Sequence, residues 1–219
     1  MIKNIKNIIW DWNGTIVNDA YLFVDIMNQT LTKYNLKNIT INDYKTNFCF
    51  PIKTYWKNLG FDFDDSTFNI MNREFIKLYK KHMQKPMLHN QIIDVLKYAQ
   101  NQSINQFILS ASEHTMLNQL IQYYKIENYF KDIVGVDNLN ACGKEKLGIN
   151  LVKQYNIDTN KTILIGDTEY DSIVAKSIGC RAILVSFGHI DGRRLQNTGD
   201  MIINSYNDLI TLFKNNEVN

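Results

Sequence analysis

A short apolar run near the start of the chain leads directly into residues that could do chemistry. The run at residues 5–10 ends at Asp11. Three small or polar residues come next, Asn13, Gly14 and Thr15. A carboxylate at the carboxyl end of a buried parallel strand can attack an electrophile, bind a metal ion, or do both. The glycine permits a sharp turn that leaves backbone N–H groups free to meet an anion.

A second apolar run, at residues 107–109, ends in hydroxyl residues. Because parallel strands end at the same edge of a sheet, Ser110 is expected beside Asp11. Taken alone, Ser110 is also typical of a turn or a helix cap. Ser112 precedes Glu113 and is a candidate N-cap.

A lysine opens the amphipathic stretch at residues 144–155. The positive end of the helix dipole disfavours a cation there, unless an anion lies in front of it. Most such lysines are solvated surface residues, and Lys146 is the alternative to Lys144. We favour Lys144 as the partner of an anion because it lies closer to the end of the preceding strand.

Two acids follow the apolar strand at residues 162–166. Asp167 stands at the strand end and can meet Asp11 across the sheet edge, while Asp171 comes one helical turn later. Clustered carboxylates repel one another unless a cation joins them, and Mg²⁺ binds carboxylates together with waters and phosphate oxygens. Asp171 has a second interpretation, as an acid that complements the dipole at a helix start.

The elements that must hold these residues alternate between β-rich runs and amphipathic stretches. This alternation predicts the α/β class, with a doubly wound, Rossmann-like parallel sheet. The expected strands cover residues 7–11, 106–110, 132–136, 162–166, 181–186 and 201–203. The expected helices cover residues 90–101, 113–124, 144–155, 170–178 and 206–215.

One interval breaks the alternation, since residues 18–85 contain no convincing parallel strand. Helical patterns cover residues 21–34 and 66–82. We predict a core domain of residues 1–17 and 86–219, with a helical cap domain of residues 18–85 standing over the sheet edge as a lid. The alternative is that these helices pack on one face of the sheet. Six aromatic residues are expected in the core of this interval: Phe48, Phe50, Tyr55, Trp56, Phe61 and Phe63.

The segment at residues 186–194 follows a strand and is a candidate rim of the site. His189 could contact a substrate or the cap, although a loop histidine more often lies at the surface. Arg193 and Arg194 could attract anions, but a solvated helix start is the favoured interpretation. Trp12 is expected to pack between the sheet and the cap.

The composition is that of a globular protein and excludes several function classes. The chain has 219 residues, is 45% hydrophobic and carries a net charge of +2, with no basic stripe for nucleic acid. No apolar stretch approaches the ~20 residues of a membrane span, and the N-terminus does not resemble a signal peptide. We therefore expect a cytoplasmic protein with a small anionic partner and no nucleic-acid or membrane partner. The three cysteines are expected to be reduced thiols.

Taken together, the segments around Asp11, Ser110, Lys144 and Asp167 resemble the haloacid dehalogenase (HAD) superfamily. Over almost the whole chain they are similar to its phosphatase branch with a helical cap after the first strand, and most of all to phosphoglycolate-phosphatase-type hydrolases. The resemblance implies a Mg²⁺-dependent phosphoric monoester hydrolase that acts on a small phosphorylated metabolite, as a monomer or homodimer.

The resemblance also implies a role for each matching residue. Asp11 would be the nucleophile that becomes an aspartyl-phosphate, Ser110 would hydrogen-bond the phosphoryl oxygens, and Lys144 would hold both groups by its charge. The expected metal ligands are Asp11, the backbone carbonyl of Asn13, Asp167 and Asp171, with Asp171 supporting either the metal or the lysine. The expected substrate contacts are Gly14, Thr15, Ser110, Ala111, Lys144 and His189.

The chain departs from the family pattern at Asn13, where these phosphatases normally carry an aspartate that acts as acid and then as base. An amide cannot carry a proton, which puts a rate factor of about 10² to 10⁴ at stake. In one hypothesis the protein is a modest phosphatase, with the proton moved by water or by another residue, that favours good leaving groups. In a second, deamidation of Asn13 beside Gly14 restores the aspartate.

Two further hypotheses come from other classes of protein. The chain could be a catalytically weakened phosphate-binding or regulatory protein, although such a protein would have no need of the nucleophile Asp11. It could also be a carbon–halogen hydrolase, because chloride leaves without a proton. The pair Asp167 and Asp171 implies a metal ion that carbon–halogen hydrolysis does not use.

Overall fold

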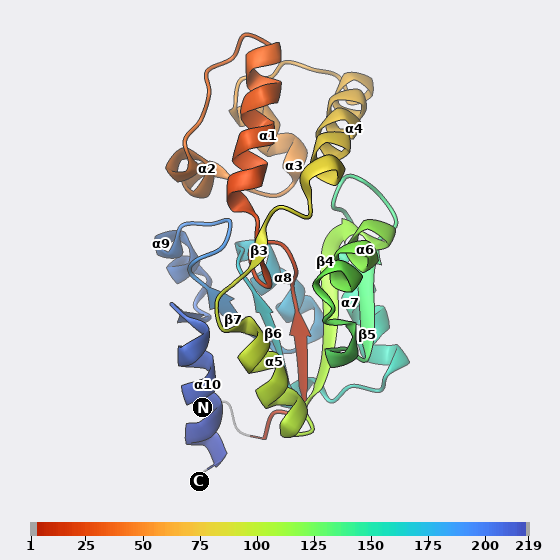
Figure 1. Ribbon diagram of the computed structural model, residues 1–219, viewed down its shortest axis with the longest axis vertical. Helices are drawn as coiled ribbons and strands as arrows, with labels where there is room; N and C mark the ends of the chain where they lie inside the picture. The colour runs from red at the N-terminus through yellow and green to blue at the C-terminus, as the bar shows by residue number, and fades with distance from the viewer. Residues whose placement is uncertain (1–3, 218–219) are drawn as a thin grey trace.

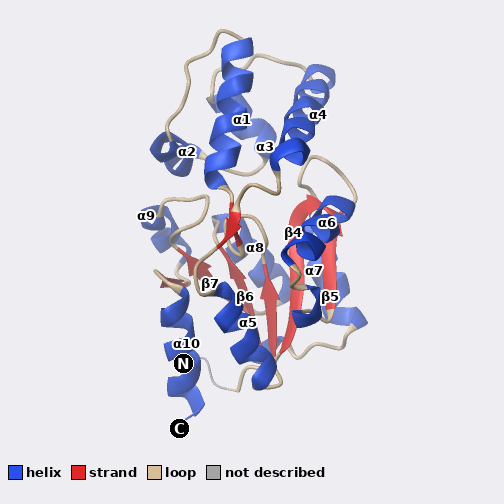
Figure 2. Ribbon diagram, viewed as in Figure 1, coloured by secondary structure: helices blue, strands red, loops and turns tan. Residues whose placement is uncertain are grey.

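Six parallel strands form the central sheet of the computed structural model, which describes residues 4–217 (Figures 1 and 2). Their order across the sheet is β5-β4-β1-β6-β7-β8. The strands are β1 (Asn7–Trp10), β4 (Asn105–Glu113), β5 (Asp132–Val136), β6 (Thr162–Gly166), β7 (Arg181–Val185) and β8 (Met201–Ile203). The predicted α/β class and parallel sheet are confirmed.

The central strands read as continuous apolar runs because helices cover both faces of the sheet. Every residue of β1 and of β6 is buried. Helices α5, α6 and α10 lie on the face toward the viewer in Figure 1, and α7 and α8 lie behind the sheet. The helices of the core are α5 (Ile92–Asn101), α6 (His114–Tyr124), α7 (Lys144–Gln154), α8 (Glu169–Ile178), α9 (Gly192–Leu195) and α10 (Tyr206–Glu217). Three 3-10 turns accompany them: Glu127–Tyr129, Thr159–Lys161 and Gln196–Thr198.

Strand β1 lies between β4 and β6, which belong to opposite halves of the sheet. The chain passes from β1 to β4 and β5 on one side, then crosses to β6, β7 and β8 on the other. Ligands in doubly wound sheets bind where the strand order reverses in this way. The carboxyl ends of β1, β4 and β6 therefore meet at the position where a site is expected.

A helical insert stands over this carboxyl edge of the sheet (Figure 1). Its helices are α1 (Ala20–Lys33), α2 (Ile41–Asn47), α3 (Ile52–Asn58) and α4 (Asp65–His82). The two crossings between core and insert pair as short antiparallel strands, β2 (Val17–Asn18) with β3 (Met87–Leu88). The alternative that these helices pack on one sheet face is wrong, whereas the predicted domain boundaries and the lid role stay predictions.

Two helices of the insert, α2 and α3, were not predicted, because each has only seven residues. A capping box of Thr40 and Asp43 marks the start of α2 and was a usable signal. Of the six aromatics expected in the core of the insert, four are buried, while Phe50 and Phe63 are half-buried.

The α9 region of the core holds the C-terminal end of α2. Arg194 donates from Nη1 to the carbonyl oxygens of Phe48 at 2.7 Å and Thr46 at 3.0 Å, and it pairs with Glu169 at 2.8 Å. The last carbonyls of a helix lack partners within the helix and attract a cation. The solvated position expected for Arg194 is therefore wrong. It is confirmed for Arg193, whose side chain is 81% exposed.

Two smaller predictions concern single side chains. Ser112 does not cap α6, because Glu113 accepts hydrogen bonds from the backbone N–H groups of Thr115 and Met116, at 2.8 and 3.1 Å. Trp12 is fully buried, and its ring contacts Tyr124 of α6, with ring centroids 5.9 Å apart. Among the helices of residues 4–217, none combines the length and the apolar character needed to cross a bilayer.

Candidate active site

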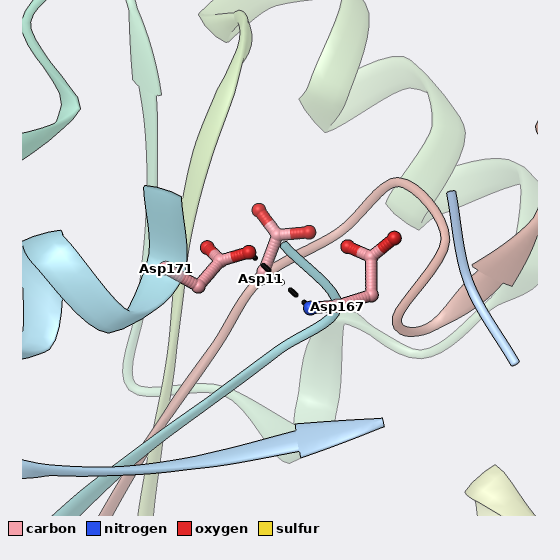
Figure 3. A group of neighbouring side chains, drawn as sticks. All are labelled: Asp11, Asp167 and Asp171. Atoms are coloured by element: carbon pink, nitrogen blue, oxygen red, sulfur yellow. Dashed lines mark hydrogen bonds between the residues drawn. The ribbon is translucent and has the colours of Figure 1, made fainter. Parts of the chain in front are cut away.

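Three aspartates meet at the carboxyl edge of the sheet (Figure 3). Asp11 directly follows β1, Asp167 directly follows β6, and Asp171 lies in the first turn of α8. One carboxylate oxygen from each lies within 4.8 Å of the others, and all three residues are buried. The strand ends and one helical turn thus bring Asp167 and Asp171 beside Asp11, although they lie 156 and 160 residues away in the sequence.

Lys144 reaches the same cluster from the start of α7. Its Nζ donates to Asp11 Oδ1 and to Asp171 Oδ1, the second at 2.6 Å, and the side chain is only 2% exposed. The dipole cost of a lysine at a helix start is offset here by two carboxylates. Lys146 is exposed, so the choice of Lys144 over Lys146 as the buried lysine is confirmed. We call Asp11, Lys144, Asp167 and Asp171 the reactive cluster.

The reactive cluster contains three carboxylates but a single ammonium group, that of Lys144. Burial raises the pKa of Asp11 to about 8, Lys144 opposes this rise, and the charges of Asp171 and Asp167 add to it. Burial likewise raises the pKa of Asp167 to about 6, against the charge of His189. Burial also works against the charge of Lys144, but Asp11 and Asp171 raise its pKa above the ordinary value. Three buried carboxylates and one ammonium fit a divalent cation bound by oxygen ligands.

Within the cluster the oxygens of Asp171 are already engaged. Its Oδ1 binds Lys144, and its Oδ2 accepts from Thr168 Oγ1 at 2.7 Å and from the Thr168 and Asp167 backbone N–H groups. Asp171 is thus both the capping-box acid of α8 and a partner of the lysine. Asp167 is engaged as well, since its Oδ2 accepts from the His189 backbone N–H at 2.5 Å, and the three aspartates together form a group that could hold a metal ion.

A cavity of about 790 Å³, including solvent at its mouth, lies between the reactive cluster and the helical insert. Ser110 and Ala111 line it from the end of β4, as does His189 from the loop after β7. Ser110 is buried, and its Oγ accepts from the Ser112 backbone N–H at 3.0 Å. The insert contributes Phe23, Phe48, Phe50, Ile52, Ile76 and Tyr79 to the wall.

A family model described as haloacid dehalogenase-like hydrolase matches residues 8–185. The chain belongs to this family. The match covers the reactive cluster and most of the core, and it includes the whole helical insert.

Comparison with curated proteins finds distant relatives in this family. The chain is 23% identical over 138 residues to a phosphoglycolate phosphatase of Pseudomonas fluorescens (strain Pf0-1), covering 62% of this chain and 51% of that protein. It is 21% identical to phosphoglycolate phosphatase 1 of Pseudomonas aeruginosa, with the same coverage. The chain thus spans about half the length of the curated relatives that it matches.

Solved structures share the fold over nearly the whole chain. A predicted phosphatase from Clostridium acetobutylicum superposes with a TM-score of 0.84 at 23% identity, covering 96% of this chain and 99% of that one. A haloacid dehalogenase-like hydrolase from Bacteroides fragilis superposes with a TM-score of 0.83 at 17% identity, covering 94% and 99%. At these identities the likeness establishes the HAD fold.

In this HAD family member Asn13 is held on three sides. Its Nδ2 donates to Asp19 Oδ2 at 2.6 Å and to the Tyr79 hydroxyl at 3.0 Å, while its Oδ1 accepts from Ser112 Oγ at 2.5 Å. The Ser112 hydroxyl is therefore turned toward Asn13. The amide is fixed at the edge of the cavity between the core and helix α4 of the insert.

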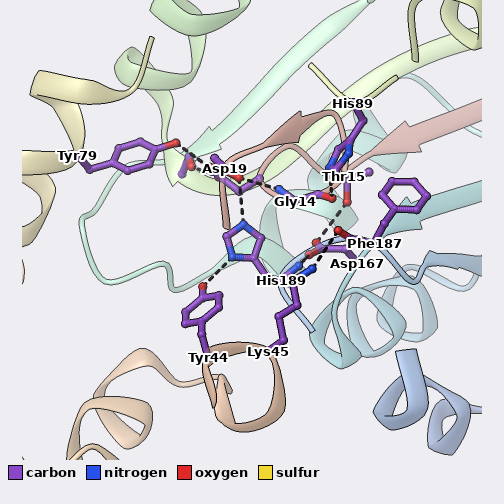
Figure 4. Close-up of polar contacts among 12 residues, drawn as sticks. Gly14, Thr15, Asp19, Tyr44, Lys45, Tyr79, His89, Asp167, Phe187 and His189 are labelled. Atoms are coloured by element: carbon purple, nitrogen blue, oxygen red, sulfur yellow. Dashed lines mark hydrogen bonds and ion pairs between the residues drawn. The ribbon is translucent and has the colours of Figure 1, made fainter. Parts of the chain in front are cut away.

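Asp19 is the centre of a second buried network (Figure 4). It accepts from the Gly14 backbone N–H at 3.0 Å and from the Tyr79 hydroxyl at 2.8 Å, and it pairs with His189 Nε2 at 3.0 Å. The other ring nitrogen of His189 meets the Tyr44 hydroxyl at 2.7 Å. We call Asn13, Asp19, Tyr79 and His189 the junction cluster, because it joins the core to α4.

The junction cluster corrects one expectation. His189 is 3% exposed, so the expected surface position is wrong. Burial works against its charge, but the hydrogen bond and charge of Asp19 raise the pKa of His189. Burial works against the charge of Asp19 as well, yet His189, Asn13 and Tyr79 together lower the pKa of Asp19.

Gly14 and Thr15 each donate a hydrogen bond to an aspartate of one of the two clusters. The Gly14 N–H is bound to Asp19, so the prediction that it is free to meet an anion is wrong. Gly14 has φ +72°, and a Cβ there would lie 2.3 Å from Asp167 Oδ2, which requires glycine. Thr15 Oγ1 donates to Asp167 Oδ1 at 3.3 Å. Neither residue lines the cavity.

Sequence reasoning missed Asp19, Tyr79 and the contact of Ser112 with Asn13. Asp19 directly follows β2, so a second acid close behind Asp11 was the available signal. No sequence spacing links it to Tyr79 or His189, which lie 60 and 170 residues away.

Proposed function

We propose that this protein is a Mg²⁺-dependent phosphatase that hydrolyses a small phosphorylated metabolite through an aspartyl-phosphate on Asp11. The observation that carries the proposal is the position of Asp11, buried beside Lys144 and Asp167 at the base of a cavity. The names of its curated relatives, phosphoglycolate phosphatases, support the reaction class. Membership of a hydrolase family supports it as well.

In the proposed reaction Asp11 Oδ2 attacks phosphorus, because Lys144 already engages Oδ1. The bond from phosphorus to the leaving oxygen breaks, which gives an aspartyl-phosphate and an alkoxide or aryloxide. Water then adds to phosphorus, the bond to Asp11 breaks, and inorganic phosphate leaves with the carboxylate restored. Mg²⁺ bound by Asp11, Asp167 and the Asn13 carbonyl would neutralise charge on the phosphoryl oxygens. Lys144 and Ser110 would hold the phosphoryl group from the other sides.

Asn13 acts as a positioning residue in this proposal. Its amide does not ionise near neutral pH, so it cannot act as a general acid or base, and it is bound by Asp19, Tyr79 and Ser112. The leaving oxygen therefore departs without a protein acid and takes its proton from solvent. We expect an aryl phosphate, whose leaving group needs no proton, to react faster than an alkyl phosphate. Equal rates on the two esters would contradict this role of Asn13.

A second candidate function is a weakened phosphate-binding or regulatory role, which the amide at position 13 favours. The test is Mg²⁺-dependent release of p-nitrophenol from its phosphate by wild type, Asp11→Asn and Asn13→Asp. Steady turnover by wild type and none by Asp11→Asn supports the phosphatase. A single stoichiometric burst by wild type, with turnover by Asn13→Asp, supports the second candidate. An intact-peptide mass of active protein shows whether Asn13 is deamidated.

The Asn13→Asp variant has a structural complication of its own. Asn13 Nδ2 lies 2.6 Å from Asp19 Oδ2, so the new carboxyl would face a buried carboxylate. Like charges at this distance raise the pKa of one partner. We therefore expect the double variant Asn13→Asp with Asp19→Ser to show the acid–base benefit more fully than the single variant.

A further inference from the structure

We propose that the cavity selects a phosphomonoester whose leaving group is uncharged and apolar, and that it rejects a substrate with a second anionic group. The inference rests on the proposed function for its reaction and names the substrate class of that same site. It is carried by the walls of the cavity, which differ sharply from its floor.

The walls above the reactive cluster are mostly apolar, although Tyr79, Ser112, Glu113 and Asn138 also line the cavity. The insert contributes Phe23, Phe48, Phe50, Ile52 and Ile76, and the core contributes Met116, Leu139 and Tyr170. A leaving group bound through the phosphoryl end of its ester must extend between these side chains. Apolar surface removed from water there contributes about 25 cal/mol per Å² to binding.

Two rings from different parts of the chain form one side of the wall. Phe50 of the insert packs against Tyr170 of α8, with ring centroids 4.8 Å apart and planes at 31°. Phe48 meets Phe50 edge-on at a centroid distance of 5.4 Å. Offset and edge-on contacts of this kind are the ones aromatic groups favour. A planar ring on the leaving group has matching surfaces to pack against.

Among residues 4–217, the lining of the cavity contains no free cation that could bind a second anionic group. Its two basic side chains are already paired. Lys144 is bound by Asp11 and Asp171, and His189 is paired with Asp19. Recognition of a carboxylate or phosphate normally uses an arginine or lysine with free donors. The described cavity provides none.

The charged residues around the mouth repeat this pattern. Glu113 lines the cavity and adds a negative charge, with Lys80 held against it at 3.5 Å. Arg194 lies outside the lining and is occupied by Glu169 and the end of α2. A second anionic group on the substrate would lose its hydration and face Glu113, which is costly in an apolar setting. The cation beside Glu113, Lys80, lies outside the lining and is already paired with that carboxylate.

The test compares two phosphonates that cannot be hydrolysed, benzylphosphonate and 4-carboxybenzylphosphonate, which differ only in a remote charge. Their dissociation constants are measured by calorimetry on the wild-type protein with Mg²⁺. We expect the carboxylated probe to bind at least about tenfold more weakly, since tenfold in affinity is only about 1.4 kcal/mol. Equal affinity, tighter binding of the carboxylated probe, or no binding of either overturns the proposal.

A matched pair of variants tests whether the missing cation causes the preference for the uncharged probe. Ile76→Lys places a cation in the wall and should narrow or reverse the preference. Ile70→Lys adds the same charge to the same helix at a 55% exposed position outside the cavity, and should leave the preference unchanged. A preference that Ile76→Lys does not narrow would overturn the proposal, because it would not arise from the missing cation.

Turnover of p-nitrophenyl phosphate by wild type separates this proposal from the proposed function. Absence of turnover with the benzyl preference intact contradicts the phosphatase and supports the apolar selection. Turnover without the preference supports the phosphatase and overturns the selection.

Discussion

Asp11 and Asp19 are both buried aspartates, only eight residues apart in the chain, yet their pKa values move in opposite directions. The pKa of Asp11 rises to about 8, whereas that of Asp19 falls below its ordinary value. Burial opposes the charge of both, so burial cannot explain the difference. Asp11 shares Lys144 with Asp171, whereas Asp19 is paired with His189 and also accepts from the neutral donors of Gly14, Asn13 and Tyr79.

The comparison separates the reactive cluster, in which carboxylates outnumber cations, from the junction cluster, in which one carboxylate has a full set of partners. In the junction cluster one carboxylate meets one histidine and three neutral donors. The reactive cluster has too little positive charge, so in our proposal it binds a cation, and the cation with Lys144 then attracts the anionic phosphoryl group. In this protein the charge balance of a buried cluster, more than its burial, distinguishes the proposed catalytic cluster from the structural one.

The largest expected effect is on turnover. Replacing Asp11 by Asn removes the proposed nucleophile and should lower p-nitrophenyl phosphate hydrolysis by at least about 10³-fold. The same change removes one uncompensated charge from the reactive cluster, so the melting temperature without Mg²⁺ should not fall. A variant that keeps a tenth of the wild-type rate, or that melts well below wild type, would contradict this.

The next effect breaks the junction cluster. Asp19→Ala leaves His189, the Gly14 N–H and the Tyr79 hydroxyl without their buried acceptor. We expect the free energy of unfolding in urea to fall by about 3 kcal/mol. Asp25→Ala removes an exposed acid from the same helix region and is the control. A loss of less than about 1 kcal/mol from Asp19→Ala would show that the cluster is not a structural unit.

Magnesium should act on one cluster and not on the other. At a concentration 100 times the dissociation constant, Mg²⁺ should stabilise wild type by about 2.7 kcal/mol, measured as a shift in thermal unfolding. The shift should shrink in Asp167→Asn and persist in His189→Gln. Equal shifts in wild type and Asp167→Asn would place the ion elsewhere.

The smallest effect extends the comparison to two histidines. Burial lowers the pKa of His89 to about 4; its ring bonds the Gly14 carbonyl at 3.0 Å and packs against Phe187, whereas His189 beside Asp19 has a raised pKa. Between pH 6.5 and 4 the unfolded chain binds a proton at His89 that the folded chain does not. Stability is therefore lost as pH falls through this window.

The check is a pair of urea titrations at pH 7 and pH 5. Wild type should lose roughly 2 kcal/mol more than His89→Gln between these values, because the glutamine amide keeps a donor and does not titrate. Equal losses would show that His89 is protonated in the folded protein.

Strand-end chemistry made much of the reactive cluster predictable. Asp11 and Asp167 each follow an apolar strand, Ser110 lies near the carboxyl end of another, and parallel strands deliver their ends to one edge. Lys144 could be preferred over Lys146 because it lies closer to the end of the preceding strand, and a cation at a helix start needs an anion in front of it. These are local rules whose consequences converge in space.

The junction cluster obeys no such rule. Asp19, Tyr79 and His189 come from the start of α1, from α4 and from the loop after β7, and only the folded chain brings them together. Arg194 was misjudged for the same reason, since its partners are carbonyl oxygens of α2 about 148 residues away. Main-chain acceptors carry no sequence signal.

The pairing of β2 with β3 gives the insert the character of an exchangeable module. Asn18 and Met87, where the chain leaves and re-enters the core, are paired positions in one ladder, so the two ends of the insertion lie about 5 Å apart. A gap of that size can be closed by a two-residue turn or opened to accept another segment. Proteins with this core could therefore exchange the whole helical insert, and with it the substrate preference, in one genetic event that leaves the reactive cluster unchanged.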